Sequence, residues 1–134
     1  MDAQTIARRA RRRQAALERA RRDPRYRRTL GRYLAAGVLG TTEDVAPYRS
    51  PIAIADALWA GRVEPRILEL LPALIVKQPS LFSNIEPLPD DLRAAVAALR
   101  KNQQPDAFRG IAGAALLRWL PAVGRRNKGP TQLR

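Results

Sequence analysis

The chain has 134 residues, 46% of them hydrophobic, which is enough apolar material for one packed domain. It carries 25 Lys and Arg against 12 Asp and Glu, a net charge of +13, and it contains neither His nor Cys. Without these residues, zinc sites, thiol nucleophiles, disulfides and a Ser-His-Asp arrangement are excluded. A charge of this size opposes folding by self-repulsion, so it indicates an anionic partner.

The first 22 residues predict a basic helical arm. Residues 3–22 lack Gly and Pro and are rich in Ala, Arg and Leu, which all favour helix. The apolar stripe of this helix is thin, with Arg13 in its seam; its members are Ala3, Ile6, Ala10, Leu17 and Ala20. A helix so polar on all sides gains little from packing, so we expect it to become ordered on a partner.

Three helical segments are predicted between residues 23 and 61. Asp23 is typical of an N-cap before Pro24, and the helix that follows is expected to end at Gly40. Its buried face is predicted from the helical spacing of Tyr26, Leu30, Tyr33, Leu34 and Gly37. Residues 41–44 predict a short helical turn. The helix starting at 50–51 is expected to end at Gly61, with an inward face of Ile54, Ala55, Leu58 and Trp59.

Three more segments follow in the second half. The most hydrophobic helix begins at Pro65 and ends before Pro79, and Pro72 is expected to kink or divide it. A proline-rich connector leads to a helix over 89–101, with acids at its start and bases at its end. The last helix is predicted from Phe108 to Leu120, ended by Pro121 and Gly124, before a mobile tail.

The predicted fold is therefore all-α, a single small bundle of five to seven short helices. We expect a basic helical arm over 1–22, a helical core domain over 23–124, and a mobile basic tail over 125–134. The charge follows this division: residues 1–33 carry +9, residues 34–117 carry −1 and residues 118–134 carry +5. The clustering of charge at the two ends predicts where an anionic partner binds.

The candidate site for a polyanion or an acidic protein consists of bases from the two ends of the chain together with Tyr48 and Arg49, and Tyr48 is expected to be exposed in a loop. Its residues are Arg8, Arg9, Arg11, Arg12, Arg13, Arg19, Arg21, Arg22, Arg25, Arg27, Arg28, Tyr48, Arg49, Arg125, Arg126 and Lys128. Arginine binds phosphate and carboxylate bidentately, although a GC-rich genome also favours arginine over lysine. The other aromatic residues are expected in the core. The apolar stripe is too thin to anchor the helix on a membrane surface. The sequence contains no helix-turn-helix pattern, so it does not predict sequence-specific recognition of DNA.

Catalysis has little support in the sequence. Two pairs of adjacent acids, Glu43/Asp44 and Asp90/Asp91, lie at predicted helix starts, where capping explains them. There is no P-loop and no GxGxxG. We therefore expect no catalytic site, no metal and no cofactor, and an enzyme using carboxylates is a remote alternative.

Location is expected to be cytoplasmic. The chain start lacks the apolar stretch of a secretory signal, and the longest apolar run, residues 67–76, is too short to span a bilayer. The absence of Cys is compatible with a reducing compartment. Partners are therefore expected among soluble macromolecules: an acidic protein, DNA or RNA.

Several segments resemble small bacterial proteins encoded beside nucleotidyltransferase-like toxins. They are Leu-Gly-Arg-Tyr-Leu-Ala-Ala-Gly-Val-Leu (30–39), Pro-Tyr-Arg-Ser-Pro-Ile (47–52), Ala-Gly-Arg-Val-Glu-Pro-Arg-Ile-Leu-Glu-Leu-Leu-Pro-Ala-Leu (60–74), Lys-Gln-Pro-Ser-Leu-Phe (77–82), Phe-Arg-Gly-Ile (108–111) and Arg-Trp-Leu-Pro (118–121). In that family the small protein is similar to an antitoxin. The resemblance implies a helical body that docks on an acidic toxin, a basic arm that neutralises it, and binding of operator DNA through the N-terminal arginines. Composition alone leaves a general nucleic-acid-binding accessory protein as the alternative.

Overall fold

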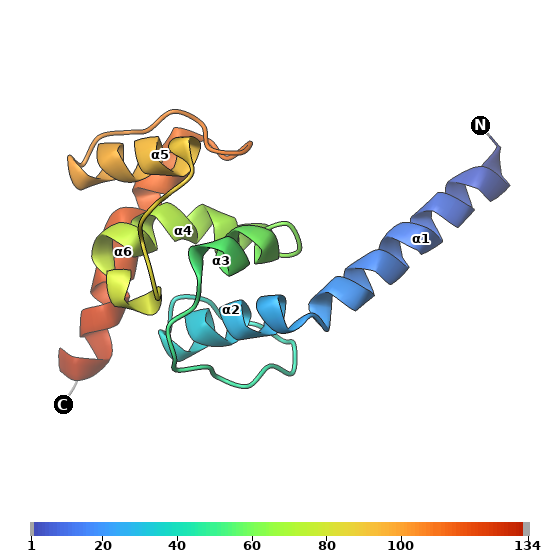
Figure 1. Cartoon of the computed structure of the whole chain (residues 1–134), viewed down its shortest axis with the longest axis horizontal. Helices are drawn as coiled ribbons and strands as arrows, with labels where there is room; N and C mark the ends of the chain where they lie inside the picture. Colours follow the sequence, from blue (N-terminus) through green and yellow to red (C-terminus); the bar gives the residue numbers. More distant parts are fainter. Residues whose placement is uncertain (1, 133–134) are drawn as a thin grey trace.

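The computed structural model describes the backbone of residues 2–132 and the side chains of residues 2–124. Within this range the chain is all-α, as predicted, with isolated bridges but no strand. The elements are α1 (Ala3–Arg21), α2 (Pro24–Ala35), α3 (Ile54–Ala60), α4 (Pro65–Lys77), the 3-10 helix η1 (Pro79–Leu81), α5 (Asp90–Arg100) and α6 (Gly113–Gln132). Helices α2 to α6 form the body of the molecule, and α1 projects from it (Figure 1).

Helix α4 lies at the centre of the body and packs against α2, α3, α5 and α6. Most of its residues are apolar, and its buried residues cover most of its circumference: Ile67, Leu70, Leu71, Pro72, Ala73, Leu74 and Ile75. Pro72 was expected to kink or divide this helix, and the helix is not divided: it runs from Pro65 to Lys77 with Pro72 inside it. The burial of the residues flanking Pro72 outweighs the one backbone hydrogen bond that proline removes.

Helix α2 begins as predicted, with Asp23 as its N-cap and Pro24 in the first turn. It ends earlier than predicted, because Gly37 rather than Gly40 takes the left-handed conformation, with φ of 73°. The N–H of Val38 donates to the carbonyl of Tyr33 (3.2 Å), and the N–H of Gly37 donates to Leu34 (3.0 Å). These two bonds satisfy the last carbonyls of the helix and form a Schellman motif.

The segment between α2 and α3 contains no helix, so the prediction of a short turn of helix over 41–44 is wrong. The hydroxyl of Thr41 accepts a hydrogen bond from the N–H of Glu43 (3.0 Å), a local turn that competes with helix. Helix α3 also begins later than predicted, because Ile52 pairs with the connector, its N–H donating to Leu81 (3.0 Å). Ala55, expected inward, is exposed, and Ala57 is buried instead.

Helix α6 begins later and ends later than predicted. Phe108 and Ile111 hydrogen-bond each other through both backbone groups, at 2.9 Å each, in a tight turn before the helix. The helix then continues past Pro121 and Gly124, the expected stops, to Gln132. Leu116, Leu120 and Val123 are buried on its inner side, and this packing favours continuation of the helix. The expected mobile tail, residues 125–134, lies entirely outside the residues whose side chains are described.

Candidate partner-binding surface

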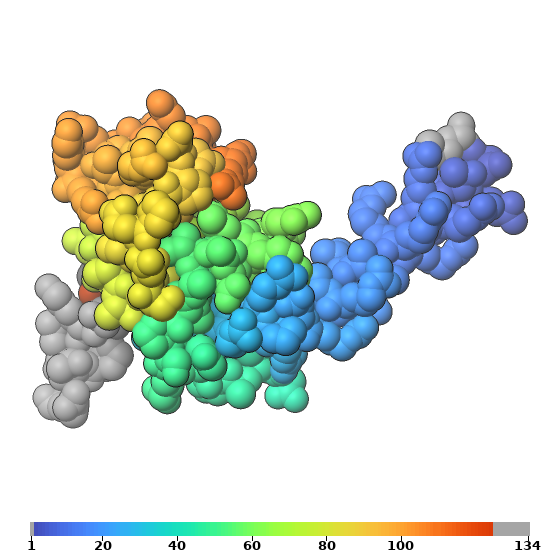
Figure 2. Space-filling model, viewed as in Figure 1, coloured from blue at the N-terminus to red at the C-terminus, as the bar shows by residue number. Residues whose placement is uncertain are grey.

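Helix α1 projects from the body as a free arm (Figures 1 and 2). Its N-cap is Asp2, whose carboxylate accepts a hydrogen bond from the N–H of Thr5 (2.8 Å), and Arg19 and Arg21 lie in its last turn. Both ends therefore suit the helix macrodipole. No residue of α1 is buried, so core packing does not hold this helix.

The arginines of α1 are unevenly distributed around the helix. Because successive residues turn by about 100°, six of them share one side, which we call the basic face: Arg8, Arg9, Arg11, Arg12, Arg19 and Arg22. The apolar stripe predicted from the sequence (Ala3, Ile6, Ala10, Leu17 and Ala20) lies on the opposite side, and Arg13 lies within it. Helix α1 is thus amphipathic, and its basic face points away from its apolar stripe.

The charge of the basic face is uncompensated. All six arginines are exposed, and none forms an ion pair or a hydrogen bond through its side chain among the described residues. The acids on or beside α1 are engaged elsewhere, Asp2 in the cap and Glu18 with the amide of Gln14 (3.3 Å). The basic face is therefore open to an external anion.

Three arginines predicted for the site are instead engaged with the body. Arg25 pairs with Asp23 (2.8 Å), and its guanidinium lies 3.9 Å from the ring centroid of Trp59. Arg28 pairs with Asp56 of α3 (3.3 Å). The guanidinium of Arg27 donates to the backbone carbonyl of residue 44 (2.7 Å). These contacts hold α2 against α3 and the following loop.

A groove lies where the apolar stripe reaches the body. It has a volume of about 250 Å³, and we call it the α1–α3 groove; it is lined by Arg13, Ala16, Leu17, Ala20, Trp59, Arg62 and Val63. Trp59 comes from α3, and Arg62 and Val63 from the turn after it. Leu17, Trp59 and Val63 are each half-buried. The groove thus combines apolar walls with two positive charges, Arg13 and Arg62, and no acid lines it.

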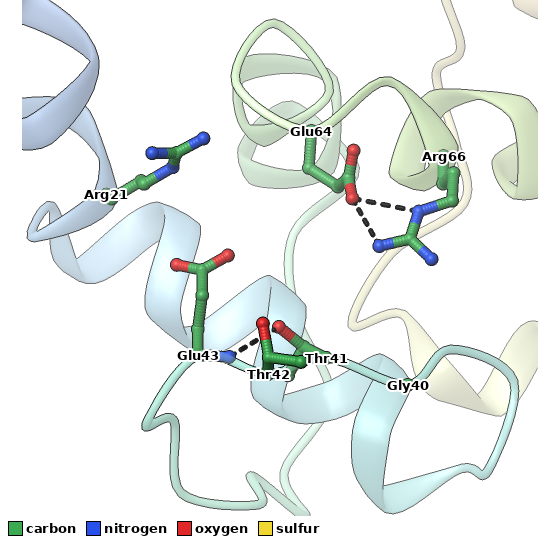
Figure 3. A pocket seen from close by; sticks show the side chains of 7 residues that line it. All are labelled: Arg21, Gly40, Thr41, Thr42, Glu43, Glu64 and Arg66. Carbon is green, nitrogen blue, oxygen red and sulfur yellow. Dashed lines mark hydrogen bonds and ion pairs between the residues drawn. The ribbon is translucent and has the colours of Figure 1, made fainter. Parts of the chain in front are cut away.

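A larger pocket lies at the junction of α1, the loop after α2 and the start of α4 (Figure 3). This junction pocket has a volume of about 570 Å³ and is lined by Arg21, Gly40, Thr41, Thr42, Glu43, Glu64 and Arg66. Its carboxylates are engaged: Glu43 accepts from the Tyr26 hydroxyl (2.6 Å), and Glu64 pairs with Arg66. Burial, and then the bond to Glu43, raise the pKa of Tyr26. Acids and bases balance here, so the junction pocket offers no net attraction to an ion.

Tyr48 and Arg49 lie apart from α1. Tyr48 is half-buried rather than exposed, because its N–H donates to the carbonyl of Gly31 (3.0 Å) and its side chain packs against the core. It is therefore not an open stacking platform. Nearby Arg32, which the sequence did not single out, has a buried Nε with no hydrogen-bond partner among the described residues. Burial, followed by the charge of Arg49, lowers the pKa of Arg32.

The remaining candidates divide by position. Arg125, Arg126 and Lys128 have side chains outside the described residues. Sequence reasoning missed three groove residues, Trp59, Arg62 and Val63. The signal that could have identified them is a large aromatic side chain that is only half-buried near the end of a helix. Helical periodicity in the sequence does not predict such partial burial.

Of the acid pairs considered for catalysis, Asp90/Asp91 lies at a helix start as predicted, whereas Glu43/Asp44 lies in a loop where no helix begins. Asp90 and Asp91 lie in the first turn of α5, where Asp90 pairs with Arg93 (3.0 Å) and Asp91 with Arg109 (2.8 Å). The Arg109 hydrogen bond lowers the pKa of Asp91. In the part of the chain that the structure describes, no group of three or more acidic side chains is placed to hold a metal ion.

No protein-family model, no curated protein and no solved structure matches the chain. The resemblance to antitoxins therefore stays a prediction. Among the described residues, none of the helices combines the length and the apolarity that a bilayer span requires.

Proposed function

We propose that this chain is a non-catalytic regulatory binding protein that holds an acidic macromolecule against α1. The observation that carries the proposal is the basic face, whose six exposed arginines have no acidic partner among the described residues. Guanidinium groups bind carboxylates and phosphates through paired hydrogen bonds. Their field also accelerates the encounter with an acidic surface.

The more specific form of the proposal is an acidic protein partner, with the chain acting as an antitoxin for a nucleotidyltransferase-like toxin. A protein partner is supported by the α1–α3 groove, since apolar walls beside arginines suit a protein surface better than bare phosphates. The arm would then block the toxin by charge and by bulk. This role also agrees with the resemblance of the segments between residues 30 and 121 to antitoxins.

Co-expression with a nucleotidyltransferase-like protein from a neighbouring gene, which the antitoxin role requires, tests this role. We expect the full chain to relieve toxicity and to co-purify with the toxin. The double substitution Arg8→Glu/Arg12→Glu should abolish both effects, because it reverses the charge of the basic face. The control Arg100→Glu/Arg118→Glu makes the same charge change on exposed positions of the body and should act like the unmodified chain. Unchanged toxicity with the full chain would refute the antitoxin role.

Nucleic acid is the second candidate, and the length of the basic face favours it. Arg8 to Arg22 span about 21 Å of helix at 1.5 Å per residue, which allows contacts with several successive phosphates. Binding of this kind weakens steeply with salt, with a log–log slope of about −0.9 for each phosphate neutralised.

Fluorescence anisotropy of a labelled DNA duplex, titrated at several NaCl concentrations, tests nucleic-acid binding. We expect a slope of roughly −3 to −5 for the full chain, and a much shallower one after removal of residues 1–22. A slope that removal of α1 does not change would place the contact outside the basic face.

A further inference from the structure

We propose that the α1–α3 groove receives an apolar side chain from an acidic amphipathic helix of the partner, and that this helix continues along the apolar stripe of α1. The inference rests on the proposed function, since it assumes a protein partner on α1. It adds the place where the partner is anchored and the chemistry of the segment that enters.

The size and walls of the groove suit a side chain. Its volume of about 250 Å³ is below the range of pockets that hold small-molecule ligands. Leu17 and Val63 form apolar walls, and Trp59 adds an aromatic ring whose position is set by Arg25 above it. Half-buried apolar groups around a hollow are typical of the anchor positions of protein interfaces.

The apolar stripe extends this surface away from the body. Ile6 is 54% exposed and is the one large hydrophobic residue exposed to this degree in the described part of the chain. It lies on the same side of α1 as Leu17, about 16 Å away along the helix axis. A stripe of this length matches about three turns of a partner helix, as in helix-in-groove recognition. Binding would bury Ile6, which nothing in the body covers.

Charge decides which occupant fits. Arg13 lies within the stripe and Arg62 at the edge of the groove, and no acid lines the groove. A second copy of this chain would bring like charges together, because its own stripe carries Arg13 and its own groove Arg62, with no acid in the lining. Nucleic-acid phosphates would leave Leu17 and Val63 facing water. An amphipathic helix with carboxylates beside its apolar side chains complements both the walls and the charges.

Trp59 supplies a direct reporter, because the chain has only two tryptophans. The variant Trp119→Phe keeps an aromatic ring at the other position and leaves Trp59 as the single tryptophan, excited selectively beyond the tyrosine absorption band. The probe is a labelled synthetic helical peptide of about 14 residues, with Leu at helical spacing and Glu elsewhere. Its control replaces each Leu by Ser. We expect saturable binding of the Leu peptide with a blue shift of Trp59 emission, and no shift with the Ser peptide or with duplex DNA.

Substitutions in α1 locate the contact. Leu17→Glu should weaken binding of the Leu peptide about tenfold or more. Ala15→Glu adds the same charge two residues away, on the opposite side of α1, and should weaken it far less. Equal effects of the two substitutions, equal binding of both peptides, or a Trp59 shift with DNA would each overturn the groove proposal and leave the proposed function standing. Absence of binding to both peptides and to DNA would overturn both.

Discussion

Gly31 determines how closely the loop after α2 approaches the helix. A Cβ at this position would lie 2.5 Å from the carbonyl oxygen of Ala46 and 3.1 Å from the Cβ of Tyr48. The same close approach allows the N–H of Tyr48 to bond the carbonyl of Gly31. A helix interior normally disfavours glycine, so this residue is explained by its neighbours and not by helix propensity.

Gly31→Ala is expected to destabilise the protein by about 3 kcal/mol, because a backbone carbonyl cannot move aside as a flexible side chain can. Gly37→Ala is the matched control. A Cβ added at Gly37 has no neighbouring atom within 4 Å. This substitution should therefore lower the free energy of unfolding only through the backbone strain of its positive φ, by about 1 kcal/mol. Urea unfolding followed by circular dichroism measures both. Equal losses would show that contact with Ala46 is not what requires Gly31.

Tyr33 joins α2 to α4 through one buried hydrogen bond, from its hydroxyl to the carbonyl of Ile67 (3.1 Å). Tyr33→Phe should therefore lower the free energy of unfolding by about 1 kcal/mol without changing the fold. Tyr48→Phe removes a hydroxyl that has no hydrogen-bond partner among the described residues and should be neutral. A neutral Tyr33→Phe would contradict the proposed role of this bond.

Asp91 makes stability depend on pH at the start of α5. The hydrogen bond from Arg109 lowers the pKa of this carboxyl in the folded state. Its contribution is therefore fully present above the ordinary aspartate value, near 4, and is lost as the pH falls through the lowered pKa. Thermal midpoints at pH 7 and pH 3 should differ less for Asp91→Asn than for the unmodified chain. If the difference between the two midpoints were the same in Asp91→Asn and in the unmodified chain, other carboxyls would be responsible for the loss of stability in acid.

At the scale of elements, α1 and the body are held by different forces. Helices α2 to α6 share a core around α4, whereas α1 buries none of its residues. In proteins most of a helix's stability comes from tertiary packing, which α1 lacks. Its arginines can therefore serve binding at little expense to the stability of the body.

Removal of residues 1–22 should leave the body folded. The thermal midpoint is expected to stay within a few degrees of the full chain, since no core contact is lost. Far-ultraviolet circular dichroism should lose signal in proportion to α1 alone. Collapse of the midpoint would show that α1 stabilises the body through its contacts with α2.

At the scale of the whole molecule, charge and core are separated. Residues 1–22 carry a net charge of +6, whereas residues 23–124, more than four times as many, carry +3. Electrostatic repulsion within the body is therefore small, and the positive electrostatic field is concentrated on the arm. This separation allows one chain to combine a stable fold with a strongly basic surface.

Salt should therefore affect binding and stability differently. Between 0.05 and 0.5 M NaCl, affinity for duplex DNA is expected to fall steeply. The free energy of unfolding should change by less than about 1 kcal/mol, because the ion pairs of the body are few and each has an exposed guanidinium. Parallel anisotropy and urea-unfolding measurements check this. A large gain of stability with salt would mean that the arm's charge acts on the body.

The sequence by itself determined the helical class, the arm and the start of α2, because these depend on local features: helix-forming residues, an Asp-Pro cap and the clustering of charge. Local signals predicted the ends of α3, α4 and α5, but they misplaced the ends of α2 and α6 and the starts of α3 and α6. Burial of α4 and α6 carried both helices through prolines, and the pairing of Ile52 with Leu81 delayed α3. The α1–α3 groove was decided only by tertiary structure. It forms where Leu17 of one helix meets Trp59 of another, 42 positions along the chain, and no periodic pattern encodes that meeting.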